Sequence, residues 1–468
     1  MVHGAKLYRA GRILVGANPT RVLRLSKRGE VTLRELRADG VCSPLHGALA
    51  RRLIDAGIAD PRPPRIGPAY SVTVVIPCLD RPELLEACLS STGAGGPVMV
   101  VDDGSADPEA VARVCERHGA RLVRRSVTGG PAAARNAALD LVDTDLVAFL
   151  DSDCIAPAGW IESLLPHFLD PLVGAAAPRI IARVERGARR SITGRFAAAA
   201  SPLDLGDRPA SVTPQSRVAY VPTAALIVRR EAMPGAFDST LRFGEDVDLV
   251  WRLVERGWRV RYDPTVRVEH AEPSSFDRFL VRRYRYGTSA GPLARRHPGR
   301  LVPLVATPWP SLIVGLCLIR RPKAAIGAFA VATLLLARNL RRAGAPAALA
   351  PKLLGRAVGG TFLGAGKAGT QLALPVILVA AGRPGWLRAV GSSLLLGPAA
   401  LEWLRRRPQL DPLRWTVLFI ADDIAYGAGV WRGCMRARTL EPLLPTLRIR
   451  ARPLRPMRTS PAARWGQE

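Results

Sequence analysis

The sequence predicts an α/β protein whose largest domain is built on a mainly parallel, doubly wound sheet. Between residues 70 and 150, short strand-like runs alternate with amphipathic helical segments, the runs are continuously apolar, and acidic loops follow them. A continuous apolar run is typical of a parallel strand that is buried on both faces. Regular alternation of strands and helices indicates a doubly wound sheet.

At 468 residues the chain is too long for one typical domain, so we expect several. Shifts in composition predict a small N-terminal module (1–60), a proline-rich linker (61–69), the α/β domain (70–290), an apolar helical region (291–447) and a basic tail (448–468). Repeated prolines exclude a helix or a central strand in the linker.

The N-terminal module has the pattern of a strand–turn–strand unit followed by two helices. Strand-like runs at 12–16 and 21–25 flank a turn, and helical spacing follows at 29–36 and 44–56. This combination is typical of small winged-helix-like domains. Three interpretations stay open for the module: recognition of a peptide, which we favour, binding of DNA, and passive packing.

In the α/β domain, strands and helices are expected to alternate regularly up to residue 150. Strands are expected at 72–77, 98–101, 121–124 and 146–150, with helices at 82–91, 106–118 and 131–141. The next part is less regular, with strands expected at 217–229, 258–262 and 266–269 and a helix at 244–257. That helix has acidic residues in its first turn and ends at a glycine, as helices commonly do.

Acidic side chains follow three of the predicted parallel strands, as Asp80, Asp102, Asp103, Asp151 and Asp153. Right-handed crossovers bring such loops to one edge of the sheet, where ligands of α/β sheets bind. Buried unpaired carboxylates are costly, and a divalent cation that carries a phosphorylated substrate would compensate them. The alternative for Asp153 is a helix N-cap.

The chain carries a net charge of +28, which is compatible with nucleic acid or an anionic membrane surface as a partner. We expect no nucleic acid, because aromatic residues are only 6%, no base-reading motif is present, and the acidic loops would repel a polyanion. The seven cysteines show no regular spacing, so free thiols are expected.

The region after residue 290 alternates apolar runs with arginine-rich segments. The charge-free runs 301–319, 324–337 and 368–382 are interrupted by proline or shorter than the ~20 residues of a spanning helix. Buried soluble helices and membrane-embedded helices both fit, and the basic flanks favour the membrane. Because 1–10 lacks a signal-peptide pattern, we expect a cell-membrane protein with its catalytic domain on the cytoplasmic side.

Five motifs in order carry a resemblance to a known family. They are Val-Val-Ile-Pro-Cys-Leu-Asp-Arg81, Val-Asp-Asp-Gly-Ser105, Gly-Gly-Pro-Ala-Ala-Ala-Arg-Asn136, Asp-Ser-Asp153 and Gly-Glu-Asp246. Residues 70–275 thereby resemble the inverting family 2 glycosyltransferases, which have the nucleotide-sugar-binding GT-A fold. The whole arrangement, including the N-terminal module and the apolar region, resembles the glycosyltransferases of mycofactocin systems.

The resemblance implies a role for each motif residue. It implies Asp246 as the catalytic base, Glu245 and Trp251 at the acceptor, and Mn²⁺ or Mg²⁺ held by Asp153, Asp151 and His270. The donor-binding residues that it implies are Pro77, Asp80, Arg81, Asp103, Gly104, Arg135, Asn136, Asp151 and Ser152. The metal would neutralise the donor diphosphate as leaving group. A helix N-terminus at Asp246 is expected to keep its carboxylate ionised.

The activity implied by the resemblance is transfer of a hexose, from UDP-glucose, to the peptide-derived redox cofactor premycofactocin, to build a short β-linked oligosaccharide. A membrane glycosyltransferase of lipid-linked or cell-wall polysaccharide synthesis is the alternative, and a nucleic-acid- or peptide-binding regulator is a distant one. Processive members carry a Gln-x-x-Arg-Trp motif, where this chain has only Arg282-Arg-Tyr-Arg-Tyr286. Long-chain synthesis is therefore not expected.

Overall fold

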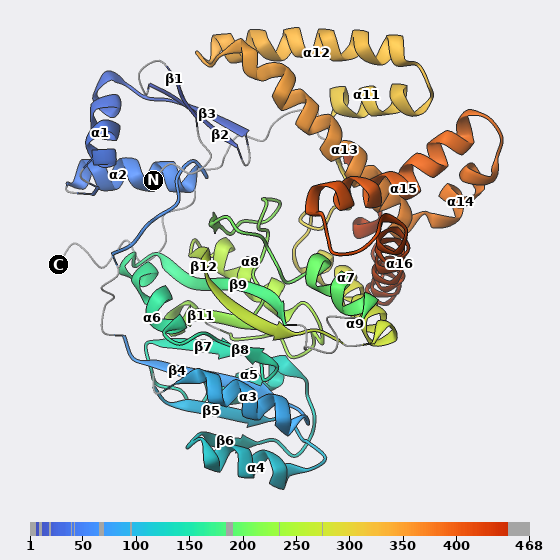
Figure 1. Ribbon diagram of the computed structural model, residues 1–468. Helices are drawn as coiled ribbons and strands as arrows, with labels where there is room; N and C mark the ends of the chain where they lie inside the picture. Colours follow the sequence, from blue (N-terminus) through green and yellow to red (C-terminus); the bar gives the residue numbers. More distant parts are fainter. Residues whose placement is uncertain are drawn as a thin grey trace.

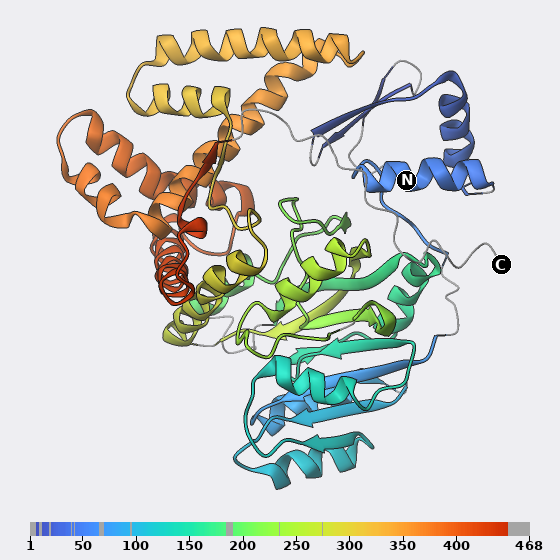
Figure 2. The same ribbon diagram turned by 180° about the vertical axis from the view of Figure 1, so that it is seen from behind.

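The computed structural model describes residues 6–8, 12–17, 20–38, 40–41, 43–64, 70–93, 96–183, 191–233, 235–273 and 275–447. The predicted tail at 448–468 and part of the linker, 65–69, lie outside these residues. Figure 1 shows an α/β body in the lower half of the view, with a small N-terminal unit and the helices of the C-terminal region above it. The view from behind in Figure 2 shows the same three parts.

The N-terminal unit is a three-stranded antiparallel sheet with two helices. Its elements are β1 (Lys6–Tyr8), β2 (Ile13–Ala17), β3 (Thr20–Arg24), α1 (Lys27–Ala38) and α2 (Pro44–Asp55). Side chains alternate across β2 because successive residues of a strand point to opposite faces. Leu14 packs with Leu33 and Leu53 of the two helices, whereas Ile13 and Val15 pack against the C-terminal region.

The central sheet has nine strands in the order β10-β12-β9-β11-β7-β4-β5-β6, with β8 paired to β12. The strands are β4 (Val72–Cys78), β5 (Val98–Asp102), β6 (Arg121–Arg124), β7 (Leu146–Leu150), β8 (Cys154–Ile155), β9 (Val173–Arg183), β10 (Ala210–Ser211), β11 (Ala225–Arg229) and β12 (Arg259–Ala271). Strands β4 to β7 are parallel as predicted, but β11 is antiparallel to both its neighbours. The sheet is therefore mixed rather than mainly parallel.

Three sequence predictions in the second half of this domain were wrong in detail. The strand expected at 217–229 begins only at Ala225, and the two strands expected at 258–262 and 266–269 are one strand, β12, with shifts in register. Strand β9 was not predicted, because its Val-Gly-Ala-Ala-Ala-Pro start has low strand propensity. This segment forms a strand because it lies between β11 and β12 in the sheet and pairs with both.

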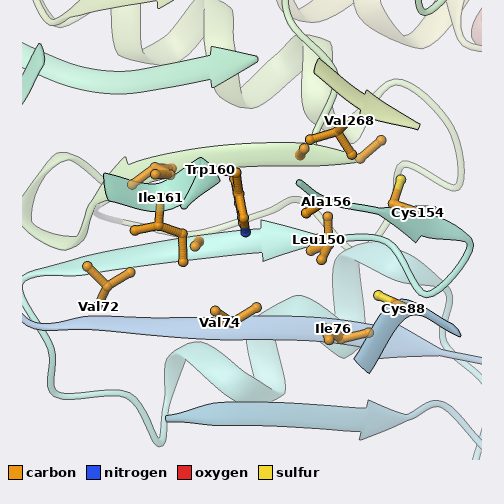
Figure 3. Close-up of a cluster of buried hydrophobic side chains, with 14 of the residues drawn as sticks. Val72, Val74, Ile76, Cys88, Leu150, Cys154, Ala156, Trp160, Ile161 and Val268 are labelled. Atoms are coloured by element: carbon orange, nitrogen blue, oxygen red, sulfur yellow. The ribbon is translucent and has the colours of Figure 1, made fainter. Parts of the chain in front are cut away.

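Two apolar layers cover the sheet. The helices of the domain are α3 (Pro82–Thr92), α4 (Pro108–Arg117), α5 (Pro131–Leu139), α6 (Trp160–Leu164), α7 (Ile192–Ala200) and α8 (Glu245–Glu255). Val74 and Ile76 face the layer that contains α3, α4 and α6, which is drawn in Figure 3, whereas Val75 faces α5 and α8. Burial on both faces explains why the strands read as continuous apolar runs.

The C-terminal region is helical. It contains α9 (Phe276–Thr288), α10 (Ala290–Arg296), α11 (Pro308–Leu318), α12 (Pro322–Arg342), α13 (Ala350–Leu372), α14 (Leu374–Gly382), α15 (Trp386–Arg406) and α16 (Pro412–Ala437), with a short parallel pair β13 (Val305–Ala306) and β14 (Thr446–Leu447). Helix α16 packs along α9 and reaches the α/β domain (Figure 1). This contact brings the C-terminal region to the edge of the cavity described below.

Within the described residues, α12 is the one unbroken helix that is long and apolar enough to cross a membrane. A second span results if residues 347–372 and α14, which are bent by 104° relative to each other, are counted as one broken span. Only 22% of the most apolar window of α12 is buried, which distinguishes it from the core helix of a soluble protein. The six described cysteines are free, as predicted, and Cys42 lies outside the described residues.

Candidate active site

A cavity of about 900 Å³ lies at the carboxyl ends of β4, β5 and β7, where the acidic loops were predicted to meet. Its size is in the range of sites that enclose a small-molecule ligand. The predicted site residues that line it are Pro77, Asp80, Arg81, Asp103, Arg135, Asp151, Ser152, Asp153, Glu245, Asp246, Trp251 and His270. The chain therefore brings most of its predicted site residues into one space.

The turn after β4 holds two consecutive residues in the left-handed backbone region. Asp80 and Arg81 both have φ of +57°, which is strained for residues with a side chain. Contacts with the neighbouring loop stabilise the turn, because Asp80 Oδ1 accepts from the backbone N–H of Ala106 at 2.9 Å and its own N–H donates to Ser105 Oγ at 2.7 Å. Both residues stay exposed at the rim of the cavity.

Asp103 follows β5 and is buried, with 3% of its surface exposed. Its carboxylate accepts from the backbone N–H groups of Gly129, at 3.1 Å, and Gly130, at 2.7 Å, and pairs with Arg125. These contacts fix the glycine loop in front of α5 against the cavity. Part of the hydrogen-bonding capacity that was expected to serve the donor is thus used by the protein itself.

Two residues that were predicted to bind the donor are not part of the cavity wall. The Asn136 side chain donates to the carbonyl of Phe237 at 2.8 Å and accepts from its N–H at 2.9 Å, so it ties α5 to a neighbouring loop. Gly104 has φ of +87°, and a Cβ there would lie 3.1 Å from Thr128 Oγ1. Both residues support the site from behind, and the structure does not place them against a donor.

Arg135, on α5, is buried at 2% exposure and joins two acidic segments. Its Nη2 donates to Asp151 Oδ1 at 2.7 Å, and its Nη1 donates to Glu245 Oε1 at 3.0 Å. The guanidinium also lies over the ring of Phe237, 5.4 Å from the ring centre. Because Asp151 and Glu245 are both engaged by Arg135, their predicted roles as metal and acceptor ligands stay predictions.

Asp246 lies in the first turn of α8, where Gly244, with φ of +83°, turns the chain into the helix. Burial, together with the charge of Glu245, raises the pKa of Asp246 to about 7. The expectation that the helix N-terminus keeps this carboxylate fully ionised at neutral pH was wrong, because desolvation outweighs the helix dipole. A carboxyl group with this pKa is well matched to accept a proton near neutrality.

Asp153 and His270 lie next to each other in the cavity wall, with Asp153 Oδ1 3.4 Å from His270 Nε2. Burial raises the pKa of Asp153, although His270 opposes this, so the carboxylate lacks enough positive charge around it. Strands β8 and β12 place the pair through the register of His270 with Cys154. The two side chains offer an oxygen and a nitrogen that fit a divalent cation. Among the described residues, no group of three or more such ligands forms a complete metal site.

The cavity lining also contains Trp251, which was predicted to lie at the acceptor, and residues without a predicted role. Trp251 is 3% exposed and its indole N–H donates to the Ala219 carbonyl at 2.8 Å, so it contributes a packed wall and no free polar group. The unassigned lining residues include Tyr220, Arg283, Tyr286 and Tyr426. The sequence of 282–286 indicates only that the processive motif is absent, and the apolar pattern of α16 does not predict contact with a ligand site.

Comparisons with known proteins agree with this geometry. A family model described as glycosyl transferase family 2 matches residues 73–232. The pre-mycofactocin glycosyltransferase of Mycobacterium tuberculosis is 39% identical over 463 residues, which cover 94% of this chain and 95% of that protein. An N-acetylglucosaminyltransferase of Mesorhizobium japonicum is 29% identical over 248 residues, 48% of this chain and 57% of that one.

Among solved structures, a mannosyltransferase from Pyrobaculum calidifontis in complex with GDP-mannose and Mn²⁺ is similar with a TM-score of 0.46 and 20% identity. The match covers 86% of this chain and 98% of the mannosyltransferase chain. The family assignment rests on the identity to the M. tuberculosis proteins, which extends over nearly the whole of both chains. The chain belongs to glycosyltransferase family 2, in the group that includes the pre-mycofactocin glycosyltransferases, and its central domain has the GT-A fold.

Proposed function

We propose that this protein is an inverting glycosyltransferase that moves glucose from UDP-glucose to pre-mycofactocin, a peptide-derived redox cofactor, and builds a short β-linked oligosaccharide. Identity to relatives that carry this acceptor in their name, over 94% of the chain, supports the pathway. The observation that carries the chemistry is the position of Asp246 in the cavity with a pKa of about 7.

In the proposed reaction, an acceptor hydroxyl oxygen attacks the anomeric carbon of the donor sugar. The bond from that carbon to the diphosphate oxygen breaks, and UDP leaves with the electron pair. The hydroxyl proton passes to the carboxylate of Asp246, which supplies general-base catalysis. Attack opposite to the leaving group converts an α-linked donor into a β-linked product, and it requires one base, a role that we assign to Asp246.

Asp153 and His270 are the side chains that would hold Mn²⁺ or Mg²⁺. Their 3.4 Å separation and the raised pKa of Asp153 fit a site that binds a cation, with diphosphate oxygens as further ligands. A bound cation would stabilise the negative charge that develops on the leaving diphosphate. Asp151 contributes through its pairing with Arg135, which keeps α5 and α8 together around the donor.

The proposal places the protein at the cell membrane, with the cavity on the cytoplasmic side. Exposed apolar side chains on α12 and α14, such as Ile326 (70%), Leu334 (66%) and Val376 (69%), support contact with lipid. Basic residues lie at or just beyond the ends of these helices and suit an anionic cytoplasmic leaflet; they are Arg320, Arg321, Lys323, Arg338, Arg341, Arg342 and Arg383.

The test uses the full chain, purified in detergent, with pre-mycofactocin and UDP-glucose in the presence of Mn²⁺. We expect products that are heavier by one and more hexose units in mass spectra, and proton couplings of a β-linkage in NMR spectra. UDP-galactose, UDP-N-acetylglucosamine and GDP-mannose serve as competing donors. An α-linked product would contradict inversion, and transfer from another donor alone would contradict the choice of sugar.

A further inference from the structure

Three tyrosines form part of the cavity wall. Tyr220 comes from the segment before β11, Tyr286 from α9 and Tyr426 from α16. These side chains are half-buried and open into the same space as Asp246. The charge of Asp246 acts on both Tyr220 and Tyr286, which places these two close to the proposed base.

Close packing of glycines holds α9 and α16 together and so fixes two of these tyrosines. A Cβ at Gly287 would overlap the carbonyl oxygen of Tyr426, and a Cβ at Gly429 would overlap that of Tyr284. Such backbone approach between helices needs residues without side chains at the contact. Tyr286 and Tyr426 are therefore presented by two helices whose relative position is tightly determined.

The hydroxyl groups of this wall are available for a ligand. Within the described part of the chain, no side-chain hydrogen bond joins Tyr220, Tyr286 or Tyr426 to another residue. Burial raises the pKa of Tyr286 to about 12 and also raises that of Tyr220, so both remain neutral donors at physiological pH.

Two arginines lie against the wall, and acidic residues engage both of them. Arg282 pairs with Glu272 and lies over the ring of Tyr286, 6.0 Å from its centre. Arg283 pairs with Asp422 and lies over the ring of Tyr426, 5.1 Å from its centre. It therefore acts as a positioning residue for Tyr426, and the wall offers aromatic faces and neutral hydroxyls to the ligand. Such a surface suits an uncharged ring that carries hydroxyl groups, because ring faces stack and phenol groups both donate and accept.

We propose that Tyr220, Tyr286 and Tyr426 form the acceptor subsite, which stacks the ring of the acceptor that bears the reacting hydroxyl and directs this hydroxyl to Asp246. The inference rests on the proposed glycosyltransferase function and deepens it. It makes Tyr426 of α16, which lies far beyond the base in sequence, a specificity-determining part of the active site. The ring can be that of the aglycone or of a sugar added earlier.

The experiment measures acceptor KM, kcat and the Kd of UDP for the full chain with Tyr426→Ala, Tyr286→Ala and Tyr220→Phe. We expect the acceptor KM to rise about five- to tenfold in each variant, because one stacking or hydrogen-bonding contact with the acceptor is lost. The Kd of UDP, measured by titration calorimetry, is expected to stay within about twofold. Pre-mycofactocin without sugar and its once-glucosylated product serve as separate acceptors. A KM effect on both indicates that the wall stacks the aglycone ring, and an effect on the glucosylated acceptor alone indicates a sugar ring.

Tyr284→Phe is the matched control, because Tyr284 is on α9 but its side chain is 37% exposed and does not line the cavity. An acceptor KM unchanged in all three cavity variants, or a change confined to the Kd of UDP, would overturn the subsite. If the wild-type protein itself transfers no sugar from any donor, the proposed function fails before the subsite is reached. The two failures are therefore distinguishable.

Discussion

Arg135 Nη1 lies 3.0 Å from Glu245 Oε1, and this contact links the donor side of the cavity to the residue directly before the proposed base. The same guanidinium holds Asp151, so a single buried cation compensates two carboxylates from different segments. Because Asp246 is adjacent to Glu245, the negative charge of Glu245 raises the pKa of Asp246, the proposed base. Helix α5, the loop after β7 and the first turn of α8 are thus joined by one network of charges.

Replacing Asp246 by Asn removes the proton acceptor while it keeps the size of the side chain. We expect kcat to fall by about 10²–10⁴-fold, the usual contribution of general-base catalysis. The Kd values of UDP and Mn²⁺ are expected to stay close to those of the wild type, as measured by calorimetry. Turnover close to wild type would remove Asp246 from the mechanism.

The pH dependence of kcat follows from the raised pKa of Asp246. The carboxylate is the active form, so kcat is expected to rise with pH and to level off above about 7. In Glu245→Gln the neighbouring negative charge is lost, and the rising limb is expected to move to lower pH. The check is a pH–rate profile at saturating substrates, and a limb near pH 4 in the wild type would contradict the burial argument.

Asp153→Asn and His270→Ala test the metal site. Each removes one of the two ligands, so we expect weaker binding of Mn²⁺ in the presence of UDP and a higher Mn²⁺ concentration for half-maximal activity. Chelation by EDTA is expected to abolish transfer in the wild type, with recovery on addition of Mn²⁺. Glu269→Gln is the control, because this residue is exposed on the same strand. Full activity in EDTA would show that the reaction needs no metal.

Arg135→Ala leaves the buried Glu245 and the partly exposed Asp151 without their partner. Removal of one member of a buried ion pair costs about 3–5 kcal/mol, so we expect a strong loss in free energy of unfolding. Denaturant unfolding followed by fluorescence measures the change. Arg113→Ala, at a side chain 58% exposed, is expected to change stability by about 0.5 kcal/mol or less. Equal stability of the two variants would contradict the importance of the buried network.

Gly429→Ala tests the close packing of α16 against α9. The added methyl group would overlap the carbonyl oxygen of Tyr284, so the helices must separate, and we expect both a lower melting temperature and a higher acceptor KM. Gly359→Ala in α13 is the matched control, since a Cβ there meets no atom within 4 Å. The control is expected to be neutral or more stable by up to about 1 kcal/mol, because alanine favours helix. If Gly429→Ala has the acceptor KM of the wild type, the packing of α16 against α9 does not contribute to acceptor binding.

The first four parallel strands and the place of the acidic loops could be predicted from the sequence. Continuous apolar runs such as Val72–Cys78 require burial on both faces, and the right-handed crossover rule then determines which edge the loops share. The resemblance to the glycosyltransferase family could be recognised because each motif is a short sequence pattern and the order of the motifs is visible in the sequence. Strand β9 escaped prediction because its small residues carry no strand pattern of their own.

What the sequence by itself determined about this protein is the alternating α/β pattern, the family motifs and the apolar, basic character of the C-terminal region. Only the tertiary structure decided the pairing of Arg135 with Asp151 and Glu245, the raised pKa of Asp246 and the entry of Tyr426 into the cavity. The physical reason is that desolvation and charge compensation depend on neighbours that lie up to hundreds of residues away in the chain. Local patterns report which residues must be buried, but not which charges they are buried with.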